Sequence, residues 1–83
     1  MNDVSFENLL QKHSIEPADD ALFASLIYHA LTDMNIGEDS FRDDFALSEG
    51  AVWRWASGQN LPQTNARPAI IKWIIAQKEK ESQ

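Results

Sequence analysis

The sequence predicts an all-α fold, a small bundle of about five helices in a single domain over residues 1–83. Two observations carry this prediction. Apolar residues recur every three or four positions along most of the chain, which is the period of amphipathic helices, and no run alternates long enough to indicate a strand. Glycine, proline and asparagine separate the chain into the successive helical segments.

The composition is that of a small globular domain. Apolar residues make up 43% of the chain, which is enough for one modest core. The absence of cysteine excludes disulfides and cysteine-ligated zinc. No apolar run is long enough to cross a membrane, and the N-terminus lacks the basic segment of a signal peptide. We therefore expect a cytoplasmic protein without membrane contact.

The net charge of −6 is distributed unevenly. Residues 1–46 hold ten acidic and two basic side chains, whereas residues 47–80 hold two acidic and five basic ones. A negative balance opposes general nucleic-acid binding, but the second half is mildly basic. The acidic half is either a solvated surface, or a surface that binds a basic protein partner or opposes non-specific DNA binding.

A first helix is predicted over residues 4–13, with Asp3 as its N-cap. Ten residues form a marginal helix alone, so this helix must dock on the rest of the chain. His13, at its end, is expected on the surface. The inward stripe consists of Phe6, Leu9 and Leu10.

A second, longer helix is predicted over residues 18–34. Pro17 suits its first turn, where a missing N–H costs nothing. The apolar arc is wide, so this segment is expected to be the central buried helix. His29 within it is expected to be a hydrogen-bonded residue at the core edge rather than a metal ligand, because no second ligand lies at a useful spacing.

Two short helices joined by a turn are predicted over residues 38–58, which is a helix-turn-helix unit. Phe41 and Phe45 lie four apart and share one face of the first helix. Ser48 is expected to cap the second helix, and Gly58 suits its C-terminal end. The inward stripe of the second helix consists of Val52, Trp55 and Ala56.

This segment resembles the "VS…V.RW..G..LP" run of Cro/CI-type (Xre-like) helix-turn-helix DNA-binding domains. The matching residues are Leu47, Ser48, Val52, Arg54, Trp55, Gly58, Leu61 and Pro62. The resemblance implies a lambda-repressor-like fold that places helix 48–57 in the major groove of double-stranded DNA. The chain departs from the pattern at Ala46, usually glycine, and at Arg42, usually alanine.

The family pattern implies that bases are read from Glu49, Gly50 and Arg54. The arginine fork matches O6 and N7 of guanine, and glutamate can accept a hydrogen bond from cytosine N4. Glycine reads nothing and permits close approach. Trp53 is expected to point outward, either onto a sugar or thymine methyl group or into a protein partner.

Further residues are expected to hold the DNA backbone and fix its register. Acidic side chains at the start of the first helix of the unit, Glu38 and Asp39, would instead face phosphate with like charge. The expected backbone contacts come from Ser48, Ser57, Gln59, Asn60 and Arg67.

The last helix is predicted over residues 66–77, with Pro68 in its first turn and a flexible charged tail over residues 78–83. It is apolar around much of its circumference, so part of it is expected to be exposed. We hypothesise that the chain forms a homodimer through this helix. The residues concerned are Ile71, Trp73 and Ile75.

The sequence contains no nucleophile motif, phosphate-binding loop or metal-spaced ligand set, so neither an enzyme nor a cofactor is expected. The leading interpretation is a sequence-specific transcriptional regulator of bacterial or phage type. The alternative is a protein-interaction module on the same scaffold, such as an acidic anti-repressor, a DNA mimic or an antitoxin-like binder. A neutral or positive surface around residues 48–60 would favour DNA, and a negative one a protein partner.

Overall fold

The computed structural model describes residues 6–16 and 18–81 and is helical throughout, with no strand in that part of the chain. This confirms the predicted fold class of a small all-α bundle. The elements are α1 (Phe6–Ile15), α2 (Asp20–Thr32), α3 (Glu38–Phe45), α4 (Ala51–Ala56), a turn of 3-10 helix η1 (Thr64–Ala66) and α5 (Arg67–Glu81).

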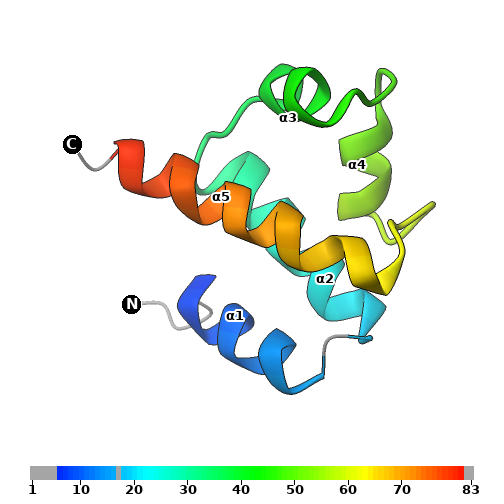
Figure 1. The fold of residues 1–83 in the computed structure, drawn as a ribbon, viewed down its shortest axis with the longest axis vertical. Helices are drawn as coiled ribbons and strands as arrows, with labels where there is room; N and C mark the ends of the chain where they lie inside the picture. The colour runs from blue at the N-terminus through cyan, green and yellow to red at the C-terminus, as the bar shows by residue number, and fades with distance from the viewer. Residues whose placement is uncertain (1–5, 17, 82–83) are drawn as a thin grey trace.

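Helix α2 is the central element, as its wide apolar arc predicts. It packs against both α1 and α4. Helix α5 crosses one face of the bundle, with α1 along one side of it and α3 and α4 on the other (Figure 1). The side chains that are most fully enclosed come from four helices, which makes one continuous core. They are Phe23, Leu26 and Ile27 of α2, Phe41 of α3, Val52 of α4 and Ile74 of α5.

Helix α2 begins two residues later than predicted. The Asp19 carboxylate accepts a hydrogen bond from the Leu22 N–H at 3.1 Å, which caps the helix so that it starts at Asp20. Pro17, predicted in its first turn, lies outside the described residues. At the other end Asn35 has a positive φ of 57°, and the Ile36 N–H bonds to the Ala30 carbonyl. The helix therefore stops at Thr32.

The outer helices are also shifted relative to their predicted bounds. Helix α1 continues to Ile15, and the predicted cap at Asp3 lies outside the described residues. Helix α5 continues to Glu81. The expected tail is thus helical for most of its length, and Lys78 Nζ lies 2.6 Å from Glu7 Oε2 of α1. No helix within the described residues is both long and apolar enough to span a membrane.

The two histidines have different surroundings. His29 is partly buried, and its Nδ1 pairs with Asp33 Oδ2, which confirms the expected hydrogen-bonded residue at the core edge. The expectation that His13 lies on the surface is wrong. Its ring is buried and packs 6.0 Å from the ring of Phe23. Burial and the positive charge of Arg67 lower the pKa of His13, and Asp19 opposes this effect weakly.

The turn after α3 holds an alanine in a left-handed conformation. Ala46 has φ 55° and ψ 49°, and its N–H bonds to the Arg42 carbonyl. A side chain with a Cβ is strained there by about 1–2 kcal/mol, and glycine is not. Ala46, which departs from the glycine of the family pattern, therefore adopts a conformation that glycine would adopt without strain.

Replacing Ala46 with glycine should raise the free energy of unfolding by about 1 kcal/mol, because relief of strain exceeds the added entropy of the unfolded chain. The matched control is Ala76→Gly on the exposed face of α5, which should lower it by about 1 kcal/mol. Urea denaturation of both variants tests this. A loss of stability with Ala46→Gly would contradict the left-handed assignment.

The depressed pKa of His13 predicts acid sensitivity. Above the ordinary value of 6.5 the imidazole is neutral in both states, so stability is intact. As the pH falls below 6.5 the unfolded chain takes up the proton first, and the free energy of unfolding declines until the folded-state pKa is passed. Urea denaturation between about pH 8 and about pH 5 should show this decline in the free energy of unfolding. The variant His13→Leu should show a smaller decline. An NMR titration that gave His13 a pKa at or above 6.5 would refute the explanation.

Candidate nucleic-acid interface

Helix α4 is shorter than predicted, and Ser48 does not cap it. The helix begins at Ala51, after Gly50 in the left-handed conformation (φ 83°). The Ser48 carbonyl accepts a hydrogen bond from the Ala51 N–H at 3.2 Å, which forms a turn before the helix. The predicted helix 48–57 is therefore a turn followed by six helical residues. The positive φ at Gly50 is the physical reason that the helix cannot begin earlier.

The two faces of α4 separate as the sequence predicts. Val52 and Trp55 are buried, and the ring of Trp55 lies 6.2 Å from that of Phe23 in α2. Trp53 is 44% exposed, and Arg54 is exposed beside it. The outer face of α4 thus presents a large indole and a guanidinium to solvent, opposite the face that is buried.

The expected base-reading positions lie together at the start of α4. A Cβ built on Gly50 would lie 3.7 Å from Arg54 Nη2, so the guanidinium folds back over the glycine. Glu49 is exposed next to it in the turn. The structure thus brings Glu49, Gly50 and Arg54 to one end of the helix.

The polar residues after α4 form an exposed loop. Gly58 and Asn60 both have positive φ, 83° and 50°, and the Gln59 N–H bonds to the Arg54 carbonyl at 2.7 Å. The side chains of Gln59 and Asn60 are exposed. The Ser57 hydroxyl donates a hydrogen bond to the Trp53 carbonyl of the preceding turn at 3.0 Å.

Arg67 is not at this surface, which corrects its assignment as a backbone contact. Its side chain is 5% exposed. Nη2 pairs with Asp20 Oδ1 at 2.8 Å, Nε donates to the Pro62 carbonyl at 3.1 Å, and the guanidinium lies 5.1 Å from the centre of the Phe23 ring. The side chain joins the start of α5 to the start of α2 and to the loop after α4, and therefore has a structural role.

Glu38 has a role that the sequence did not reveal. Its Oε2 accepts a hydrogen bond from the Gly50 N–H at 2.7 Å, so the first residue of α3 holds the entry to α4. Twelve residues separate the partners, and no local spacing rule signals such a contact. The carboxylate therefore stabilises the turn and also places negative charge beside the base-reading positions.

The predicted dimer surface on α5 is used within the chain. Ile71 is buried, and Ile75 is partly buried against the core. Trp73 packs on the rings of Phe41 and Phe45 at 4.6 and 5.4 Å between centroids, and its indole N–H donates to an Asp44 carboxylate oxygen. Contacts with helices on two sides account for the apolar residues of this helix, and the homodimer through Ile71, Trp73 and Ile75 stays a hypothesis.

Comparisons of the chain with protein-family models, with curated proteins and with solved structures find no significant match.

A structural role for Arg67 has a direct test. Arg67→Lys keeps the charge, but an ammonium group cannot stack on Phe23 and also bond to both Asp20 Oδ1 and the Pro62 carbonyl oxygen. We therefore expect the free energy of unfolding to fall by about 1.5–3 kcal/mol. The matched control is Arg54→Lys, whose exposed side chain should change stability by less than about 0.5 kcal/mol. Thermal and urea denaturation measure both. Equal stability of the two variants would return Arg67 to the list of candidate surface contacts.

Proposed function

We propose that the chain is a sequence-specific DNA-binding regulator of Cro/CI type that acts in the cytoplasm and reads the major groove with the outer face of α4. The observation that carries the proposal is the division of α4 into a buried face, Val52 and Trp55, and an exposed face that presents Trp53 and Arg54. The resemblance of the sequence around these residues to such regulators supports the same assignment.

The proposed contacts follow from the side-chain chemistry. Arg54 donates two hydrogen bonds to a guanine, and Glu49 accepts one from a cytosine amino group. Gly50 has no side chain and lets the DNA approach the guanidinium above it. Trp53 rests on a sugar or a thymine methyl group. Polar side chains of the turn and loop supply the proposed backbone contacts, which come from Ser48, Ser57, Gln59 and Asn60.

Charge limits the affinity of such a reader. Between residues 48 and 60 the charged side chains are one glutamate and one arginine, Glu49 and Arg54, and the Glu38 carboxylate at the Gly50 N–H adds a negative charge beside them. With Arg67 buried, few cations are left to neutralise phosphates. We therefore expect a shallow dependence of affinity on salt concentration and a large share of binding from base contacts.

A protein-interaction module is the second candidate, and one observation favours it. The Glu38 carboxylate of α3 accepts a hydrogen bond from the Gly50 N–H at the start of α4. Asp39 and Asp43, also on α3, are exposed. This end of the unit would repel phosphate and attract a basic protein. An acidic anti-repressor, a DNA mimic or an antitoxin-like binder would use it in that way.

One experiment separates the two candidates. Fluorescence anisotropy of a labelled pool of random DNA duplexes, titrated with protein at several salt concentrations, is followed by selection and sequencing of the bound fraction. Binding with one enriched motif supports the DNA reader. Absence of binding at low salt, where electrostatic attraction is strongest, contradicts it and favours the protein-interaction module.

Arg54→Ala should weaken binding to the selected motif by about 1–3 kcal/mol and relax the preference at one base pair, because a bidentate contact is lost. The matched control is Lys12→Gln on α1, which removes one positive charge away from α4 and should leave affinity and preference unchanged. Titration against the motif and against single-base variants measures both effects. An Arg54→Ala variant that bound every site as the parent does would refute the assignment.

A further inference from the structure

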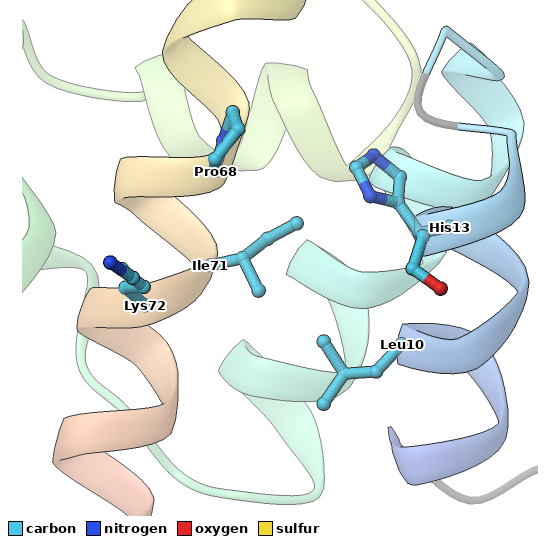
Figure 2. A pocket seen from close by; sticks show the side chains of 6 residues that line it. Leu10, His13, Pro68, Ile71 and Lys72 are labelled. Atoms are coloured by element: carbon cyan, nitrogen blue, oxygen red, sulfur yellow. The ribbon is translucent and has the colours of Figure 1, made fainter.

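A pocket lies between α1 and α5, on a different part of the molecule from α4. Its volume is about 350 Å³, and it is lined by three residues of each helix. Figure 2 shows Leu10 and His13 reaching from α1 toward Ile71 on α5, with Pro68 and Lys72 on the α5 side. The sixth lining residue is Ser14.

The walls of this pocket are apolar. Leu10 and Ile71 face each other across it, and the Pro68 ring adds a third apolar surface (Figure 2). His13 contributes a ring that is kept neutral near pH 7 by burial and by the charge of Arg67. Such a surface favours an apolar group large enough to touch both helices.

The charged side chain that lines this pocket is a lysine, Lys72, in a chain whose net charge is −6. Lys72 lines it, is exposed, and makes no ion pair with any described residue. Besides burial, the pKa of the His13 ring in the wall is influenced by both Arg67, which lowers it, and Asp19, which raises it, with the effect of Arg67 the larger. Among the residues that the structure describes, no carboxylate lines the pocket. An anionic ligand at the edge of this apolar surface would lie near the side chain of Lys72, which pairs with no carboxylate among the described residues.

A second hollow provides an internal comparison. It lies where α1 turns toward α2, has a volume of about 380 Å³, and is also lined by a lysine and two apolar residues, Lys12, Ile15 and Leu22. Glu16 and Asp19 line it as well. The two hollows are similar in size but opposite in charge, so an anion should bind in the first hollow and not in the second.

We propose that the α1–α5 pocket binds a small amphiphilic monocarboxylate, with its apolar body between Leu10 and Ile71 and its carboxylate at Lys72. The ligand bridges two helices that the Lys78–Glu7 ion pair already joins farther along. Binding therefore stabilises the packing of α1 on α5. This site is separate from the proposed DNA surface, and neither depends on the other.

Phenylacetate is the probe, and phenylacetamide, which has nearly the same shape without the charge, is the matched ligand. Methyl-resolved NMR of the full chain should show the Leu10 and Ile71 signals shifting with phenylacetate at low-millimolar Kd, as expected for so few atoms. The Ile15 and Leu22 signals of the second hollow should not move. Phenylacetamide should bind about three- to fivefold more weakly, which is the scale of one exposed ion pair.

The variant that tests the carboxylate position is Lys72→Gln, and the matched control is Lys12→Gln. Because both lysines are exposed, both variants should fold, and their methyl NMR spectra show whether they do. We expect Lys72→Gln to weaken phenylacetate about three- to fivefold and to leave phenylacetamide unchanged, and Lys12→Gln to change neither. Equal binding of acid and amide, equal shifts at Ile15 and Leu22, or no shift at millimolar probe would each overturn the proposal.

Discussion

The packing around the Phe23 ring is the contact on which the rest of the structure depends. The ring is fully buried in α2 and meets one group from each of three other helices. These are the His13 ring of α1 at 6.0 Å, the Trp55 ring of α4 at 6.2 Å and the Arg67 guanidinium of α5 at 5.1 Å. A cation over a desolvated aromatic face is stabilised more strongly than at an exposed site. The orientations of α1, α4 and α5 are thus set around one side chain of the central helix.

The candidate DNA surface depends on this core because α4 could not form alone. A helix of six residues is far below the length that is stable in isolation. It is held by Val52 and Trp55 from inside, and by the Glu38 carboxylate at the Gly50 N–H. The outer face of α4 is not packed in the core, so its side chains can contact DNA without a cost to the packing. Arg54 is an example, because its guanidinium lies over Gly50 at the surface and not in the core.

Helix α5 shows why an apolar sequence is weak evidence for an interface. Its apolar residues extend around the helix because it has neighbours on two sides. Trp73 packs on the aromatic rings of α3, and Ile71 lines the pocket shared with α1. The second contact is incomplete, since the pocket between α1 and α5 remains open beside Lys72. The surface predicted to pair with a second chain packs on α3 and α1, and a concave site remains between α1 and α5.

The sequence by itself determined the helices, the order in which they occur and the faces they bury, because these follow from local periodicity. It also showed Ala46 as a departure from the family pattern and predicted that Trp53 and Arg54 face outward. Only the tertiary structure decided the roles of side chains whose partners are remote in the sequence. Arg67 pairs with Asp20 across 47 positions and Glu38 with Gly50 across 12. A charged residue carries no local signal that it will be buried, because its burial depends on a carboxylate, a carbonyl and an aromatic face that meet only when the helices pack.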